Sequence, residues 1–292
     1  MDNKASRKAS LGFTLKKIRK NKNYTQKFVT DGVIGQSAYS KIERGVIDPS
    51  ISTFRDILRR LDMGEEEFRY LMGEELNERE ELIQAFFLQN YNDQTTLEKI
   101  NERVKHYLID NNDYLLQDIS YICEALILII ENRDYKQANI FANKVWNRLA
   151  KYDRWYLMEF RLLNSILFVF PIESVLEIAD RMNNQLKDFN SRESRVILNN
   201  LQINISLVLI RNSAYDSALT HLNDLSQRFR EERNYYLLAI VYMRKGIALS
   251  LLKNPEANIF LEKALRLVEA FDEKDLELAF LDEIKHYTTE EE

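Results

Sequence analysis

Cysteine is almost absent from this chain, since Cys123 is the single example in 292 residues. One thiol can form neither an internal disulfide nor a cysteine metal cluster, so we expect a protein of the reducing cytoplasm. Apolar runs are short: none approaches the roughly 18 residues of a membrane span, and no signal peptide opens the chain. Cys123 lies within the apolar stretch 119–130, which predicts a buried and unreactive thiol.

Glycine is scarce and unevenly distributed. Six of the seven glycines lie in the first 73 residues, and Gly246 is the one that follows. A sheet protein built from the remaining residues would need many turns with positive φ, for which glycine is the favoured residue. The shortage therefore predicts an all-α structure after residue 73.

Positive charge is concentrated at the start of the chain. Residues 1–60 carry 14 Lys/Arg and 5 Asp/Glu, a net +9, whereas residues 61–292 carry a net −14. A phosphate backbone would attract the first segment and repel the second. A merely solvated charge run is the alternative, so a nucleic-acid interpretation requires a matching structural motif.

Such a motif coincides with the basic segment. The expected helices span about residues 10–21, 25–30, 36–44, 50–61 and from 64 onward. Thr25 and Ser50 are predicted N-caps, Gly45 is a predicted C-terminal stop, and the turn between the second and third helices contains Gly32 and Gly35. Short helices with this spacing are typical of a helix-turn-helix.

These residues resemble the XRE/Cro-like helix-turn-helix family over about residues 11–72. The string Ile42-Glu43-Arg44-Gly45 followed by Pro49-Ser50 carries the resemblance most specifically. The resemblance implies a five-helix bundle whose third helix enters the DNA major groove, and a structural ion pair between Arg19 and Glu43.

Mapped onto this chain, the resemblance gives candidate DNA-binding residues: Gln26, Lys27, Gln36, Ser37, Tyr39, Ser40, Lys41 and Arg44. Base edges would be read by Gln36, Ser37 and Lys41, with Tyr39 or Ser40 near the groove wall. Phosphates would be bound by Gln26, Lys27 and Arg44. Mere solvation is the alternative for the third-helix residues, and Tyr39 could belong partly to the core. An N-terminal arm, Lys4, Arg7 and Lys8, is either a further DNA contact or a disordered tail.

A helical repeat organises the rest of the chain. Each unit has an apolar helix, a short break and a second helix that opens on a small or apolar anchor; the anchors are Leu97, Ala138, Val175, Ala218 and Ala257. The first helices are expected at about residues 78–91, 114–131, 154–170, 193–211 and 234–252. A small residue where paired helices cross is typical of tetratricopeptide repeats, so we predict a right-handed α-solenoid of about five helix pairs.

Polar residues interrupt the expected inner helices. The candidate ligand-binding residues are Arg161, Asn164, Asn200, Asn204, Tyr242 and Arg244. Asn200 and Asn204 lie one turn apart, and an amide can both donate to and accept from a peptide backbone. Each residue could instead satisfy a neighbouring helix or loop. An apolar groove in an acidic body predicts an apolar ligand, with a cationic group as an option.

The combination resembles the Rgg/GadR/MutR regulators along essentially the whole chain. This resemblance implies a DNA-binding domain over residues 1–72 and a peptide-sensing, dimerising repeat domain over 73–292. It also implies a cytoplasmic homodimer that acts in quorum sensing, with operator DNA, a short hydrophobic signalling peptide and RNA polymerase as candidate partners.

Two other classes of function compete with a peptide-controlled regulator. In a DNA-binding scaffold, the helical repeats would dock another protein, and a broad polar concave surface would favour that function. An enzyme is not supported, because the sequence contains no nucleophile elbow, glycine-rich phosphate loop or metal constellation. We therefore predict no catalytic residues, no metal and no cofactor.

Overall fold

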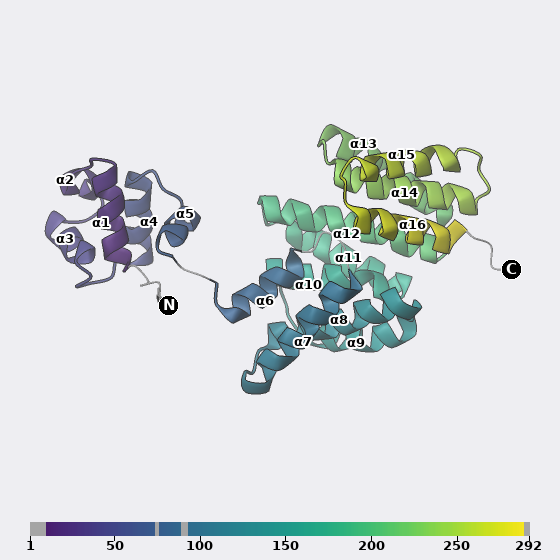
Figure 1. The fold of residues 1–292 in the computed structure, drawn as a ribbon, viewed down its shortest axis with the longest axis horizontal. Coiled ribbons are helices and arrows are strands. Elements are labelled where there is room, and N and C mark those ends of the chain that lie inside the picture. Colours follow the sequence, from purple (N-terminus) through teal and green to yellow (C-terminus); the bar gives the residue numbers. More distant parts are fainter. Residues whose placement is uncertain (1–9, 74–75, 89–92, 289–292) are drawn as a thin grey trace, which may run out of the picture. The chain divides into compact units, whose positions relative to one another are not determined.

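The computed structural model describes residues 10–73, 76–88 and 93–288. The chain forms two compact units, Met1–Glu78 and Arg79–Glu292, which we call the head and the body. The described residues form sixteen α-helices and one 3-10 helix, with no strand, which confirms the all-α prediction (Figure 1). No helix in these ranges is long and apolar enough to cross a membrane. The predicted arm of Lys4, Arg7 and Lys8 lies outside the described residues.

The head contains the five predicted helices. They are α1 (Leu11–Asn21), α2 (Gln26–Thr30), α3 (Gln36–Glu43), α4 (Ile51–Arg60) and α5 (Glu65–Leu71). Thr25 and Ser50 cap α2 and α4, since their side chains accept hydrogen bonds from the backbone N–H groups of Phe28 and Thr53. Gly32 has a φ of +71°, so the turn between α2 and α3 does require a left-handed residue.

Apolar residues from all five helices form the core of the head: Leu15, Ile18, Val29, Tyr39, Ile42, Ile57, Leu58, Leu61 and Phe68. Gly12 lies where α1 crosses α3, and a Cβ there would stand 1.8 Å from the carbonyl oxygen of Ile42. This contact brings α3 tightly against α1 and leaves the opposite face of α3 to solvent.

The body consists of helix pairs followed by one additional helix. The helices are α6 (Glu78–Phe87), α7 (Gln94–Asp110), α8 (Tyr114–Asn132), α9 (Tyr135–Leu149), α10 (Leu157–Ile166), η1 (Leu167–Val169), α11 (Ile172–Leu186), α12 (Arg192–Arg211), α13 (Tyr215–Glu231), α14 (Tyr235–Leu251), α15 (Ala257–Glu269) and α16 (Lys274–Thr288). The first helices α8, α10, α12 and α14 pack against one another in order, and the second helices pack beside them. This is the layered arrangement expected of a helical repeat.

The predicted anchors all lie in the interior of the body. Leu97, Ala138, Val175 and Ala218 are completely buried, and Ala257 nearly so. The third pair departs from the prediction, because its first helix begins at Leu157 and ends in the 3-10 turn η1 before Pro171. Proline has no N–H to continue a helix and restricts the residue before it, which accounts for this early end.

Two apolar cores fill the body. The first joins residues from α6 to α12, as far as Val208, and the second joins residues from α12, starting at Ile203, to α16. Cys123 is completely buried in the first core, and burial raises the pKa of its thiol to about 12, as predicted for an unreactive cysteine. The two cores meet along α12.

Candidate functional site

The outer face of α3 presents most of the predicted DNA-reading residues to solvent. Gln36, Ser37, Lys41 and Arg44 are exposed, and Ser40 is half-buried. Positions separated by four residues share one face of a helix, so these side chains form a single polar surface. Gly45, with a φ of +69°, ends the helix directly after them. A short helix with an exposed polar and basic face has the geometry of a major-groove reader.

Tyr39 does not belong to this surface. Its side chain is completely buried among the apolar residues of the head, so its prediction as a DNA-binding residue is wrong. Tyr39 lies on the inner face of α3, which packs against α1. The alternative prediction, that Tyr39 belongs to the core, agrees with its burial.

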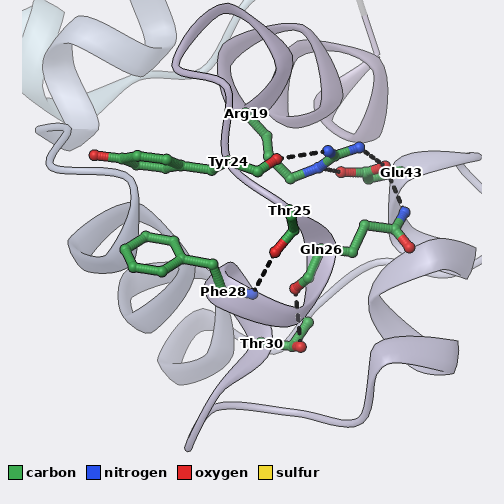
Figure 2. A network of polar contacts seen from close by, with 7 residues as sticks. All are labelled: Arg19, Tyr24, Thr25, Gln26, Phe28, Thr30 and Glu43. Atoms are coloured by element: carbon green, nitrogen blue, oxygen red, sulfur yellow. Dashed lines mark hydrogen bonds and ion pairs between the residues drawn. The ribbon is translucent and has the colours of Figure 1, made fainter.

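The predicted ion pair between Arg19 and Glu43 is present in the head. The Arg19 Nε and Glu43 Oε1 atoms are 2.5 Å apart, and a second bond of 2.9 Å joins Nη2 to Oε2 (Figure 2). Nη1 of the same guanidinium donates to the carbonyl oxygen of Tyr24 at 2.9 Å. The pair therefore joins α1, α3 and the segment that leads into α2.

The same carboxylate also holds a predicted phosphate ligand. Gln26 Nε2 donates to Glu43 Oε2 at 2.8 Å, which fixes the side-chain amide at the start of α2 (Figure 2). An amide nitrogen has two N–H bonds, so one remains for an external acceptor such as a phosphate oxygen. Lys27, the next residue, is exposed.

Electrostatics keep Glu43 ionised. Burial acts to raise the pKa of its carboxyl, but hydrogen bonds from Arg19 and Gln26 outweigh burial and hold this pKa below 4.5, its usual value. The carboxylate is therefore charged at neutral pH and accepts all three bonds.

The body contains a cavity of about 970 Å³. Its walls come from the first helix of every pair and from α16. The lining includes Phe87 of α6, Ile129 of α8, Phe168 of η1, Val196 and Leu207 of α12, Ile240 of α14, and Phe280 of α16. Most of the lining side chains are apolar, and they are drawn from segments up to about 200 residues apart in the chain. This is the form of a ligand site that the fold assembles from many elements.

Five of the six predicted ligand-binding residues line this cavity: Arg161, Asn164, Asn200, Asn204 and Arg244. Tyr242 is not among the lining residues. Its ring lies 5.9 Å from that of Phe260, on the side of α14 that faces α15. The fold brings the other five together from α10, α12 and α14.

The three asparagines of this set have different environments. Asn204 Nδ2 donates to the backbone oxygen of Asn164 at 2.7 Å and to Asn164 Oδ1 at 2.9 Å. Asn164 Nδ2 in turn donates to the carbonyl oxygen of Ile197 at 3.1 Å. These two residues hold α10 against α12. Asn200 is exposed in the cavity, and its amide makes no hydrogen bond to another described residue.

Two of the predicted arginines are held by acidic partners. Arg161 pairs with Glu193 at 2.8 Å, and Arg244 Nε pairs with Glu283 of α16 at 3.2 Å. Arg244 is 7% exposed and also donates from Nη1 to the carbonyl oxygen of Ile203 at 2.5 Å. Arg244 is buried and Arg161 is half-buried, and the ion pairs of both arginines help to fix the walls of the cavity.

The cavity wall carries more positive than negative charge. Its ionised lining residues are Arg133, Arg161, Arg192, Arg244, Glu193 and Glu283. This lining does not favour the option of a cationic group on the ligand, which rested on the acidic charge of the whole body. Net charge over a segment does not determine the charge of one cavity inside it.

Sequence patterns missed several lining residues. Arg192 and Glu193 stand at the start of α12, and Phe280, Glu283 and Tyr287 belong to α16. The repeat gave no signal for α16, because this helix follows the last pair. In the sequence, the stretch 261–287 is apolar on one face when drawn as a helix, and this is the one available indication.

The comparisons with known proteins agree with both units. Residues 15–68 match the helix-turn-helix family model. PlcR of Bacillus thuringiensis, solved with the peptide PapR7 and DNA, is 20% identical, with a TM-score of 0.65 over 93% of this chain and 98% of its own. The SHP pheromone receptor Rgg2 of Streptococcus dysgalactiae is 18% identical, with a TM-score of 0.69 over 97% and 100%.

A putative transcriptional regulator from Listeria monocytogenes is 19% identical, with a TM-score of 0.68 over 96% of this chain and 98% of its own. These matches span nearly the full length of both partners in each comparison. They confirm the fold that the resemblance to Rgg-type regulators predicted: a helix-turn-helix head followed by a helical repeat body.

Proposed function

We propose that this protein is a sequence-specific transcription regulator, with a DNA-binding domain over residues 1–72 and a sensing domain over 73–292. The head supports DNA binding because α3 exposes Gln36, Ser37 and Lys41 on one face. Amides pair with adenine edges, and lysine reaches guanine acceptors or phosphates. The net +9 of residues 1–60 suits the phosphate backbone.

The sensing function is proposed from the cavity, which is the single observation that carries it. Along α12 its lining runs from Arg192 to Leu207. A helix rises 1.5 Å per residue, so this wall is roughly 22 Å long. An extended chain advances about 3.3 Å per residue, so a peptide of about seven residues would span it. The apolar lining favours a hydrophobic peptide, and Asn200 would bind its main chain.

Two solved structures of similar proteins support a peptide-sensing function. PlcR was crystallised with a peptide and DNA, and Rgg2 is described as a pheromone receptor. Transfer of these activities to this chain is part of the proposal and places it in quorum sensing, in the cytoplasm where the DNA is. We extend it to a homodimer that reads two half-sites about one helical turn apart and influences RNA polymerase.

The competing function is a scaffold whose body docks another protein. That function would suit a broad, open and polar concave face. The cavity favours the peptide instead, since most of its lining is apolar and α16 contributes residues to its wall.

A cavity-filling variant tests the peptide proposal. Ala279 is an exposed lining residue of α16, so Ala279→Trp should occupy part of the cavity, whereas Leu278 is exposed but outside the lining. Pools of apolar peptides of about seven residues are titrated against the full chain. We expect binding to the native protein and to Leu278→Trp, and loss of binding to Ala279→Trp. Equal binding to all three would contradict the proposed site.

A further inference from the structure

The arginines of the cavity differ in whether an acidic residue neutralises them. Arg161 pairs with Glu193, Arg244 pairs with Glu283, and Arg133 forms an ion pair with Asp282 of α16. Arg192 also lines the cavity, but within residues 10–73, 76–88 and 93–288 its guanidinium has no carboxylate partner. Among the arginines of the lining, Arg192 is therefore the one whose positive charge is not neutralised by a carboxylate of the described residues.

Arg192 shares one face of α12 with the proposed main-chain ligand of the peptide. Arg192, Val196 and Asn200 follow one another at intervals of four residues, and all three line the cavity. Eight residues of helix separate the first from the last, a rise of roughly 12 Å. In an extended peptide this distance corresponds to three or four residues, at about 3.3 Å each.

From this arrangement we infer that Arg192 binds a carboxylate of the peptide. The inference deepens the proposed function and rests on it. Arg192 is the first α12 residue of the lining, so the carboxylate belongs to one end of the ligand. Val196, which lines the cavity between Arg192 and Asn200, would pack against apolar side chains of the peptide. The carboxylate belongs either to a terminal acidic side chain or to the C-terminus itself.

The guanidinium also selects against other ligands. A planar fork of N–H donors binds a carboxylate through two parallel hydrogen bonds. A peptide end without an anionic group would cover the guanidinium and remove its water without replacing the hydrogen bonds, which disfavours binding. A lysine at the same end would add repulsion, so the site distinguishes ligands by charge as well as by apolar content.

Peptide pools of defined composition test this inference. The peptides are about seven residues long, and the remaining positions are random mixtures of Leu, Ile, Val and Gly. One position, at the start, middle or end, is fixed as Glu, Gln or Lys, and each pool is made with a free and with an amidated C-terminus. Affinity for the full chain is measured by fluorescence anisotropy. The Glu and Gln arms test an acidic side chain, and the free and amidated arms test the terminal carboxylate.

We expect the native protein to bind the best carboxylate pool about tenfold more tightly than its neutral counterpart, as a charge-assisted hydrogen bond allows. The preferred Glu position, or the free C-terminus, should lie at one end and not in the middle. Arg192→Gln should abolish the preference, and Arg192→Glu should transfer it to the Lys pool. Arg195→Glu makes the same charge change at an exposed α12 position outside the cavity and should keep the native preference.

Two failures remain distinguishable. If the native protein binds the pools but treats carboxylate and neutral forms alike, or if Arg192→Glu keeps the native preference, the role of Arg192 is overturned and the peptide site stands. If the native protein binds none of the pools, the proposed peptide function fails, and the inference fails with it.

Discussion

Asn204 donates two hydrogen bonds to Asn164, one to its backbone oxygen at 2.7 Å and one to its side-chain oxygen at 2.9 Å. These bonds cross from α12 to α10, at the place where the two apolar cores of the body meet. Asn200, one turn earlier on α12, has its amide in the cavity. The two asparagines therefore have separable roles, one in the stability of the body and one in binding.

Alanine substitutions should separate these roles. Asn204→Ala leaves two oxygens of Asn164 without their donor, so we expect it to lower the unfolding free energy of the body by about 1–3 kcal/mol. Asn200→Ala should change that stability by less than about 0.5 kcal/mol and weaken the binding of apolar peptide pools. Both tryptophans, Trp146 and Trp155, lie in the body, so tryptophan fluorescence in urea reports its unfolding. The reverse pattern would contradict the assignment.

Acid should weaken the head through Glu43. The pKa of this carboxyl lies below 4.5 in the folded protein. The folded structure therefore stabilises the ionised carboxylate relative to the unfolded chain. This contribution is complete above the usual pKa and is lost as the pH falls through the lower, folded value. We expect amide protection in α1 and α3 to decline in that range, measured by hydrogen exchange corrected for the intrinsic pH effect.

Glu43→Gln provides the control for this pH dependence. It should cost about 2 kcal/mol at neutral pH, since hydrogen bonds to a charged group are lost or weakened. Its stability should then be less sensitive to acid, because the titrating carboxyl is gone. An acid response identical to that of the native protein would assign the effect to other carboxyls.

The exposed face of α3 should determine which DNA sequence is bound. Gln36→Ala combined with Lys41→Ala removes two candidate base contacts, each worth about 1–3 kcal/mol of discrimination. We expect the double variant to lose preference for duplexes that the native protein selects from a random pool. Binding by the native protein should also weaken steeply with salt.

A matched pair of substitutions controls this experiment. Lys20→Ala with Asn21→Ala likewise removes one lysine and one side-chain amide, from exposed positions at the end of α1. This variant should keep the sequence preference. If the α3 variant retains the native footprint, α3 is not the reading helix.

Gly246 should be required for the packing of α14 on α15. A Cβ at this position would lie 2.5 Å from Leu261 Cδ2 and 3.0 Å from the Leu261 backbone nitrogen. Alanine improves helix propensity by about 1 kcal/mol, but overpacking costs about 1–3 kcal/mol. We expect Gly246→Ala to destabilise the body in urea. An increase in stability would mean that Leu261 moves aside without cost.

Local patterns predicted the helices and anchors well, because capping, apolar periodicity and small crossing residues act over short distances. Thr25, Ser50 and Ala138 are examples whose structural roles follow from their immediate neighbours. The pattern could not decide between Tyr39 as core and Tyr39 as surface, because one residue on a short helix can serve either. Nor could it predict that Asn164 and Asn204 pair, since their contact depends on how α10 and α12 pack.

The sign of charge in the cavity was also beyond local reasoning. Arg133 follows α8, Arg192 belongs to α12 and Glu283 to α16, and tertiary packing alone brings them to one cavity. The net charge of a segment includes charged residues on surfaces that lie outside the cavity, so it does not predict the charge of the cavity wall.

We propose that a peptide bound in the body changes the affinity of the head for DNA. The most direct measurement is the affinity of the full chain for a selected duplex, with and without a saturating peptide from the tightest pool. Coupling between two sites is reciprocal, so we predict that DNA changes peptide affinity by the same factor as peptide changes DNA affinity. Ala279→Trp should retain DNA binding and lose the response to peptide. Equal DNA affinity with and without bound peptide would contradict the account.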